Sequence, residues 1–329
     1  MREKSSRLED VARMAHVSKM TVSLCLRADQ GEGRVSLDTR ERVINAVREL
    51  GYKPNVHARG LRLGRSDVIA LCAGHGYLNV RKPYFTEIVS GLQEGCEIAR
   101  KDLLLQGAFH TAEGSELIPE LLNGRVDGLI VDMFPNDPLA TMLLDANLAV
   151  IAISNEIEGI PSIVVDDYAG SQMIAHHLAS LGHQRVAYVV AEFEPLSGQK
   201  RRLSFLDAAA DLGLHTLIVH TNTEELWCLW IRQMLDMGVT ALACWNDDYA
   251  HLVLRELLEM GIEVPGKVAV TGFDGCPATS IEKHPLTTIA APWSEVARSA
   301  VLSLSSILAG AQVEHRVVYP VQFVRGATS

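Results

Sequence analysis

Hydrophobic residues in the first 50 positions recur three and four residues apart, the spacing that gathers them on one face of an α-helix. The pattern breaks twice, so it predicts three short helices. Their inward positions are, in chain order, Leu8, Val11, Ala12 and Ala15; then Val22, Cys25 and Leu26; then Val43, Ile44, Val47 and Leu50.

The ends of these helices carry capping residues. Ser6 and Glu9 have the spacing of a capping box, Ser18 and Ser36 are good N-caps for the second and third helices, and Gly51 suits a C-cap. Two short helices around a tight turn, braced by a third, form a helix-turn-helix, whose second helix places its first residues on base edges in the major groove. A three-helix module for protein–protein contact is the alternative.

Beyond position 66, short apolar runs alternate with amphipathic segments, the pattern of buried parallel strands and covering helices. The first set has strands at 68–73, 103–108, 126–131 and 150–154, with helices at 84–100, 115–122 and 138–146. The second set has strands at 163–165, 186–190, 217–220, 241–244 and 268–273, with helices at 170–181, 201–212, 224–237 and 248–260. Two such series predict two doubly wound α/β lobes, with ligands bound outside the carboxyl ends of the strands.

Charge separates the two parts of the chain. Positions 1–65 hold 14 lysines and arginines against 8 acidic residues, whereas the remainder holds 16 against 32, within a net charge of −10. The basic head (positions 1–65) on an acidic body (the remainder) indicates that the head binds a polyanion. A charged face that is merely solvated is the plainer alternative. The charged N-terminus, the lack of an apolar run of about 18 residues and six cysteines without CxxC pairs predict a soluble, intracellular protein.

Several segments together resemble the lactose-repressor (LacI-type) family of bacterial transcription regulators. In the head these are "LEDVARMAHVSKMTVS", "VSLDTRERVINAVRELGYKPN" and "HARGL"; in the body they are "VDDYAGSQMIAHHLASLGHQRVAYV", "NDDYA", "MGIEVPGKVAVTGFDG" and "PLTTIAAP". The resemblance implies a periplasmic-binding-protein-like body, a homodimer on a pseudo-palindromic operator, and a hinge helix that inserts a leucine into the minor groove.

Carried onto this sequence, the resemblance implies DNA contacts from the second helix and the hinge. The expected DNA-binding residues are Ser18, Lys19, Met20, Thr21, Ser23, Leu24 and Arg27 in the head, and Asn55, Ala58, Arg59 and Leu61 in the hinge. Leu24 stands where the family usually has an arginine that reads a guanine, and a leucine can at most pack on a thymine methyl. An unusual operator sequence is therefore expected.

The resemblance also places a ligand site in the body, for a sugar or sugar derivative. The candidates are Tyr84, Phe85, Asp166, Arg201, Asn246 and Asp274. The polar ones would orient a small hydroxylated ligand and the aromatic pair would form an apolar wall. Each has a structural alternative: Asp274 as a turn cap, Asn246 as a helix N-cap, Arg201 as a solvated charge, the aromatic pair as core, and Asp166 as a crossover residue, which is the favoured interpretation for Asp166.

The expected organisation is a helix-turn-helix domain at 1–53, a hinge at 54–65 and an effector-binding and dimerisation domain at 66–329. Within the last, one lobe spans 66–161 and 291–316 and the other spans 162–290 and 317–329. By resemblance, the predicted function is a repressor in the bacterial cytoplasm, associated with the nucleoid. It is expected to be a DNA-binding regulator whose operator affinity is switched by a metabolite. A solute-binding protein and a regulator with a degenerate, unresponsive pocket are the alternatives.

The sequence gives little support for an enzyme. His176 and His177 are adjacent on a predicted helix, about 100° apart, so they cannot bind one metal from one face. The acidic pairs 166–167 and 247–248 are neighbours rather than facing carboxylates, and GxSxG and HExxH do not occur. No catalytic residue, cofactor, metal or membrane contact is therefore predicted.

Overall fold

The computed structural model describes residues 6–26, 35–53, 64–73, 79, 81–106, 124–134, 137–146, 148–192, 194–221, 227–276 and 285–329. The chain divides into two compact units, Met1–Ser66 and Asp67–Ser329. This division lies within one residue of the boundary at which the apolar pattern predicts that the body begins.

The first unit contains the three predicted helices: α1 (Leu8–Met14), α2 (Lys19–Cys25) and α3 (Leu37–Glu49). Val11, Val22 and Val43, one from each helix, are fully buried in their shared core. Ser18 caps α2 as predicted, because its hydroxyl accepts a hydrogen bond from the Thr21 amide at 3.0 Å.

The predicted cap of the first helix is wrong. Arg7 rather than Ser6 occupies the N-cap position, and its amide donates to the Asp10 carboxylate at 2.9 Å. The Ser6 hydroxyl donates instead to the carbonyl oxygen of Leu50, at 2.6 Å, at the end of α3. A long-range acceptor thus competes successfully with the local capping box, and it ties the start of the unit to its last helix.

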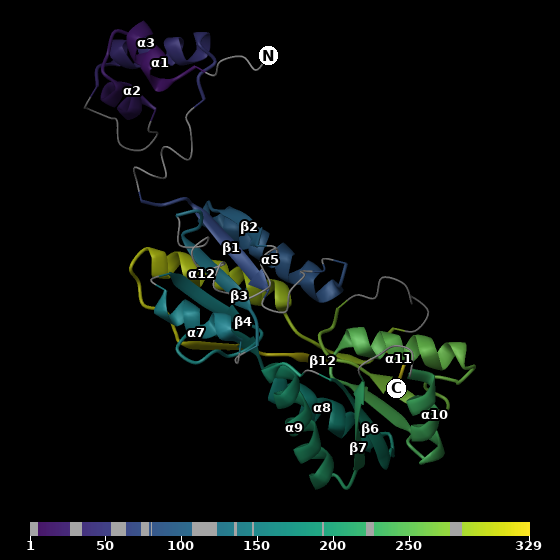
Figure 1. Cartoon of the computed structure of the whole chain (residues 1–329). Coiled ribbons are helices and arrows are strands. Elements are labelled where there is room, and N and C mark those ends of the chain that lie inside the picture. Colours follow the sequence, from purple (N-terminus) through teal and green to yellow (C-terminus); the bar gives the residue numbers. More distant parts are fainter. Residues whose placement is uncertain are drawn as a thin grey trace. The chain divides into compact units, whose positions relative to one another are not determined.

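The N-lobe of the second unit is built on a parallel six-stranded sheet in the order β11-β5-β4-β3-β1-β2. Its strands are β1 (Val68–Ala73), β2 (Asp102–Gln106), β3 (Gly128–Asp132), β4 (Ala149–Ile153), β5 (Ser162–Val165) and β11 (Arg316–Tyr319). Helices α5 (Pro83–Ala99) and α12 (Trp293–Leu308) lie side by side on one face, and α7 (Pro138–Asp145) covers the other (Figure 1). Alternate strand residues feed these two cores, as in a doubly wound fold.

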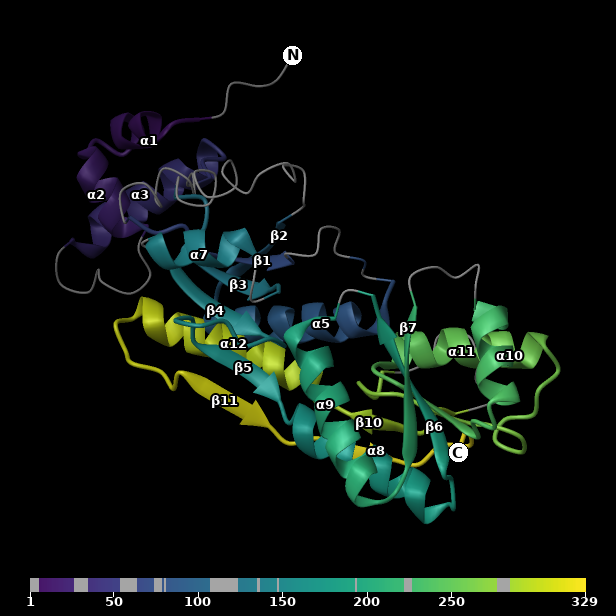
Figure 2. The same cartoon turned by 60° about the horizontal axis from the view of Figure 1, so that its bottom comes forward.

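The C-lobe has a parallel sheet in the order β7-β6-β8-β9. Its strands are β6 (Arg185–Ala191), β7 (His215–Thr221), β8 (Ala241–Cys244) and β9 (Ala269–Thr271). Helices α8 (Asp167–Ser180) and α9 (Leu196–Asp211) pack together on one face, while α10 (Trp227–Asp236) and α11 (Asp247–Glu259) cover the other (Figure 2). The short antiparallel pair β10 (Thr288–Ala290) and β12 (Gln322–Val324) adjoins α8.

The predicted lobe boundaries need correction. The strand expected to open the second lobe, β5, pairs instead with β4 and β11 in the first sheet, and β11 belongs to that sheet as well. The chain therefore passes between the lobes after Val165, between Ala290 and Trp293, and between Tyr319 and Gln322. The apolar pattern alone assigns a strand but not its sheet, because the pairing partner of β5 is a strand about 150 residues later.

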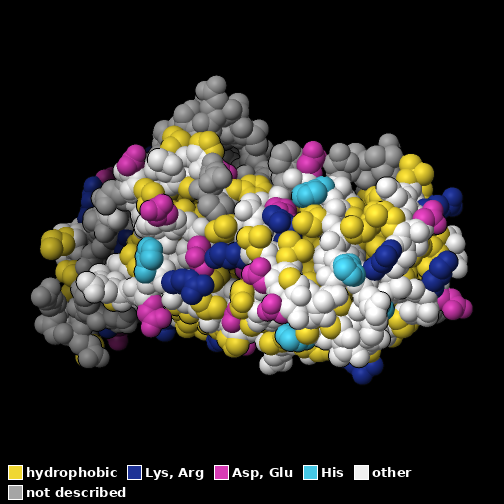
Figure 3. Space-filling model, turned by 90° about the horizontal axis from the view of Figure 1, so that it is seen from below, with side chains coloured by type: hydrophobic (Ala, Val, Ile, Leu, Met, Phe, Trp, Pro, Cys, Tyr) yellow, Lys and Arg dark blue, Asp and Glu magenta, His cyan; other side chains and the backbone are white. Residues whose placement is uncertain are grey.

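The remaining predicted strands are confirmed to within a few residues, and the helix expected at 115–122 lies outside the described residues. Among the described helices, none is both long and apolar enough to cross a membrane. Of the side chains coloured in Figure 3, acidic and basic ones are intermixed rather than gathered by sign.

Candidate ligand site and DNA-binding surface

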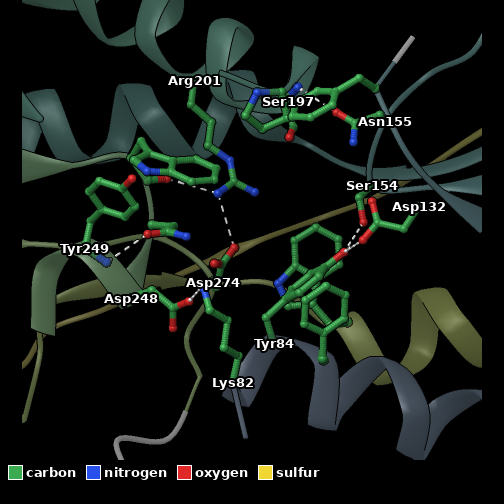
Figure 4. Close-up of a pocket in the computed structure, with 16 residues that line it drawn as sticks. Lys82, Tyr84, Asp132, Ser154, Asn155, Ser197, Arg201, Asp248, Tyr249 and Asp274 are labelled. Atoms are coloured by element: carbon green, nitrogen blue, oxygen red, sulfur yellow. Dashed lines mark hydrogen bonds and ion pairs between the residues drawn. The ribbon is translucent and has the colours of Figure 1, made fainter. Parts of the chain in front are cut away.

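The carboxyl ends of both parallel sheets face one cavity of about 300 Å³ within the second unit (Figure 4). Strand order reverses between β1 and β3 in the first sheet and between β6 and β8 in the second, and ligands bind at such switch points. The lining residues are Lys82, Tyr84, Phe85, Asp132, Phe134, Ser154, Asn155, Pro195, Ser197, Arg201, Trp245, Asn246, Asp248, Tyr249, Asp274 and Trp293. Six aromatic rings and a few charged groups are a chemistry typical of small-molecule sites.

Arg201, from α9, organises the C-lobe side of the cavity and is only 2% exposed. Its Nε donates to Asp167 at 2.7 Å, and its Nη1 donates to Asp274 at 3.2 Å and to the Trp245 carbonyl at 3.0 Å. Its guanidinium also stacks 3.7 Å from the centre of the Phe273 ring. Burial alone would lower the pKa of Arg201, but the two carboxylates outweigh burial and raise that pKa. Arg201 is therefore a fixed cation that joins the ends of β8 and β9 to the start of α8.

Asp274 lies just beyond β9 with a backbone φ of 123°, a region that non-glycine residues rarely adopt. The strain is held by neighbouring backbone, since the Asp274 amide donates to Ile289 at 2.8 Å and its carbonyl accepts from Ala291 at 3.1 Å. Burial raises the pKa of Asp274 to about 8, despite the opposing attraction of Arg201. Asp274 is therefore a strained, buried carboxyl at the end of a strand, and it faces the cavity (Figure 4).

This pKa predicts a specific pH dependence of stability. Between about pH 4 and pH 8 the unfolded Asp274 is ionised while the folded one keeps its proton, so rising pH favours the unfolded state. The wild-type melting temperature should therefore fall more between pH 5 and pH 8.5 than that of Asp274→Asn, by several degrees for a difference of up to about 4 kcal/mol. Thermal scans in matched buffers measure this, and equal pH profiles for the two proteins would show that Asp274 is ionised when folded.

The N-lobe side of the cavity is built around Tyr84, at the start of α5. Its hydroxyl donates to the Asp132 carboxylate at 2.9 Å and also contacts the Ser154 hydroxyl. Asp132 ends β3 and Ser154 follows β4, so two strand ends fix one phenol. The Tyr84 ring packs edge-on against Trp293, with their centres 5.1 Å apart, and against Phe85 at the same distance. This arrangement presents an apolar wall with acceptor oxygens at its rim.

Two polar contacts cross from one lobe to the other at opposite sides of the cavity (Figure 4). Lys82, which caps α5, forms an ion pair with Asp248 of α11 at 3.0 Å. The Asn155 side chain, from the β4–β5 loop, accepts a hydrogen bond from the Ser197 amide of α9 at 3.0 Å. The lobes are therefore held together around the cavity by groups that also line it.

Five of the six ligand candidates, namely Tyr84, Phe85, Arg201, Asn246 and Asp274, line the cavity, so the structure brings them together. Asn246 is also the N-cap of α11, because its side chain accepts a hydrogen bond from the Tyr249 amide at 3.0 Å. The N-cap role, which was the structural alternative for Asn246, is therefore confirmed. Asp166 is the exception among the candidates: it caps α8 by accepting from the Ala169 amide at 2.9 Å and is not among the lining residues. This position, where the chain crosses between the lobes, agrees with the structural interpretation favoured for Asp166. Ligand contact by the other five stays a prediction.

Sequence reasoning missed lining residues from both lobes. Asp132 and Ser154 stand at the ends of predicted strands, so the rule that ligands bind outside the carboxyl ends of parallel strands could have found them. Trp245 and Asp248 flank Asn246 and could have been found in the same way. Lys82 and Trp293 carry no comparable local signal, because only the packing of α5 and α12 brings them to the cavity.

On the first unit, the exposed residues at the start of α2 form a surface suited to base contact. Met20 is 73% exposed, Lys19 is exposed, and Leu24 is half-buried on the same helix. Lys19 forms an ion pair with Glu9 of α1, and this contact lowers the pKa of the Glu9 carboxyl. The predicted contacts Arg27, Asn55, Ala58, Arg59 and Leu61 lie outside the described residues.

The comparisons with known proteins match both parts of the chain, the helix-turn-helix head and the two-lobed body. The model of bacterial regulatory proteins of the lacI family matches residues 7–55, and that of the periplasmic binding protein-like domain matches residues 175–329. The regulator DegA of Bacillus subtilis is 28% identical over 299 residues, which cover 87% of each chain. Two solved structures, each 25% identical in sequence, are also similar. One is the Lac repressor dimer bound to operator and the anti-inducer ONPF, with a TM-score of 0.84 and coverage of 99% of each chain. The other is a complex of the regulator CelR with cellobiose, with a TM-score of 0.71 and coverage of 98% of this chain and 100% of that one.

A helix-turn-helix head joined in one chain to a two-lobed, periplasmic-binding-protein-like body defines a DNA-binding transcription regulator. The chain is similar to the LacI-type bacterial regulatory proteins over nearly its whole length, and residues 7–55 match the model of that family itself.

Proposed function

We propose that this protein is a homodimeric regulator that binds a pseudo-palindromic operator and changes its operator affinity when an uncharged carbohydrate enters the body. The observation that carries this proposal is the cavity itself, where two parallel sheets direct their carboxyl ends, six aromatic rings and several hydrogen-bonding groups at one space. The CelR complex with cellobiose and the Lac repressor dimer on its operator support the same assignment. Since the target is chromosomal DNA, the protein acts in the bacterial cytoplasm.

The switch follows from the two-lobed body. A ligand that contacts both lobes binds their closed arrangement more tightly than the open one and therefore shifts the population toward closure. If closure changes how two bodies associate, it changes how two heads fit a two-fold operator. The coupling must be reciprocal, so operator DNA should alter sugar affinity by the same factor by which sugar alters operator affinity.

The first test is titration of the full-length protein against its own upstream DNA at two salt concentrations, repeated with ribose, galactose and cellobiose. Tight, salt-sensitive and sequence-selective binding that one sugar changes is the expected result. Selective DNA binding that no sugar changes would favour a regulator with an unresponsive cavity. The proposal also holds that the body binds its ligand without converting it, so turnover of a bound sugar would contradict it.

Leu24 offers a prediction about operator choice. Replacing Leu24 by arginine should create a preference for guanine at one operator position, worth about 1–3 kcal/mol, because arginine can bond guanine through two donors. Competition binding on operator variants that differ at single positions measures this preference. Met14→Arg is the control, since Met14 is exposed on α1 and gains the same charge away from α2. If both variants gain affinity without base preference, Leu24 does not face a base.

A further inference from the structure

Lys82 is an unusual residue for the position that it occupies, the N-cap of α5. N-caps are usually serine, threonine, aspartate or asparagine, whose side-chain oxygens accept from the first helical amides, and the Lys82 side chain makes no capping hydrogen bond. A cation at the start of a helix is also disfavoured by the helix dipole. Both local effects favour another residue, so the lysine requires an explanation from elsewhere in the structure.

The explanation is the ion pair that Lys82 forms with the other lobe. Its Nζ lies 3.0 Å from Oδ2 of Asp248, in the first turn of α11, where the helix dipole favours a carboxylate. The two side chains are 52% and 28% exposed, so solvent and salt reach the pair. Because Lys82 belongs to the N-lobe and Asp248 to the C-lobe, the pair exists only while the lobes lie together (Figure 4).

The ion pair lies away from the edge of the N-lobe sheet where the chain crosses between the lobes. Two of the three crossings leave from β5 and β11, the two strands at one edge of that sheet. Helix α5, which begins next to Lys82, packs towards the other edge, against β2. Lobes that turn about their covalent connections separate most on the far side. Opening of the body must therefore break the Lys82–Asp248 ion pair.

The second contact between the lobes at the cavity supplies a reporter of opening. The Ser197 amide donates to the Asn155 side chain at 3.0 Å, on the opposite side of the cavity (Figure 4). Ser197 is the second residue of α9, and the first amides of a helix have no acceptor within the helix. Separation of the lobes therefore exposes this amide to exchange with solvent. The Gln199 amide, in contrast, donates to Pro195 within the same turn, at 3.0 Å, and stays paired.

We infer that Lys82 and Asp248 form a latch, an ion pair that favours the closed arrangement of the lobes and slows the passage of ligand into and out of the cavity. A pair with this exposure should raise the ratio of closed to open body about two- to fivefold. Because salt screens exposed charges, opening should also depend on ionic strength. The inference rests on the proposed function in one respect, its consequence that the latch slows release of a bound sugar by a similar factor.

The test is hydrogen exchange of the full-length protein without ligand, resolved to single amides by mass spectrometry with fragmentation. The variants are Lys82→Ser, Asp248→Asn and the double mutant. Arg81→Ser is the matched control, since Arg81 is the neighbouring residue, loses the same charge, is exposed and does not line the cavity. Each protein is measured at about 0.05 M and about 0.5 M NaCl, which changes the screening of exposed charges. Thermal melting of each protein accompanies the exchange.

Each single variant should exchange the Ser197 amide about two- to fivefold faster than wild type at low salt, with Gln199 unchanged. The double mutant should exchange no faster than either single variant, because both residues act through one contact. High salt should bring wild type close to the variants, and the control should match wild type at both salts. Lys82→Ser should melt no lower than wild type, because serine is the better N-cap, so faster opening would not reflect a weaker fold.

Unchanged Ser197 exchange in both single variants would overturn the latch. Equal acceleration of Ser197 and Gln199 would also overturn it, because it would show fraying of α9 rather than separation of the lobes. Effects that multiply in the double mutant would show that Lys82 and Asp248 act separately, with the same consequence. These measurements need no ligand, so failure of the latch leaves operator and sugar binding untouched, and failure of sugar binding leaves the exchange result intact.

Discussion

Replacing Arg201 by methionine is expected to destabilise the second unit by about 3–5 kcal/mol, because it leaves the buried Asp167 carboxylate without its cation and the buried Asp274 carboxyl without its hydrogen-bond donor. Asp167 and Asp274 both depend on this guanidinium, and burial raises the pKa of each carboxyl even with Arg201 present. The methionine also removes the donor to the Trp245 carbonyl and the charge above the Phe273 ring. The ends of two strands would lose the group that joins them.

Urea unfolding followed by tryptophan fluorescence measures this effect cleanly, since all four tryptophans lie in the second unit. Lys200→Met is the control. Lys200 is the preceding residue, its side chain is 37% exposed, and it pairs with Glu156 at 2.8 Å. An exposed ion pair of this kind contributes less than about 1 kcal/mol. If the two variants lost similar free energy of unfolding, the buried arginine would contribute no more to stability than the exposed lysine does.

Replacing Gly91 by alanine is expected to cost about 3 kcal/mol or more, although alanine favours a helix by about 1 kcal/mol over glycine. A Cβ at Gly91 would lie 2.0 Å from the backbone oxygen of Ser294 and 2.7 Å from its carbonyl carbon. Backbone atoms cannot rotate aside, so α5 and α12 would have to separate. The close approach of these two helices therefore requires glycine at this position.

The same fluorescence experiment tests Gly91→Ala, with Ser90→Ala as the control on the exposed side of α5. The control should be neutral or slightly stabilising, as expected for an alanine in a helix. Because α5 begins at the cavity with Lys82 and Tyr84, separation of the helices should also weaken sugar binding. Unchanged stability and unchanged sugar affinity would show that the helices tolerate a wider spacing.

Much of the fold follows from local patterns in the sequence. Short apolar runs and 3.6-residue spacing predicted the described strands up to β9 and the described helices up to α11, because each of these elements must bury a face wherever it finally lies. The later elements β10, α12, β11 and β12 were not predicted. Ser18 and Asn246 are caps by the same logic, since a cap needs only an amide three residues away. The resemblance to the LacI-type family implied that Arg201, Asn246 and Asp274 share one site, and these three residues do line the same cavity.

Alone, then, the sequence determined most of the elements, the two-part organisation and the resemblance to LacI-type regulators, because these depend on side-chain spacing and on motifs read along the chain. Only the tertiary structure decided which sheet holds β5, which acceptor Ser6 bonds, and that Asp166 caps a helix outside the cavity. It also brought Lys82 and Trp293 into the site. The reason is that each of these outcomes is a choice between partners far apart in the chain, and packing and hydrogen bonding between distant elements make that choice.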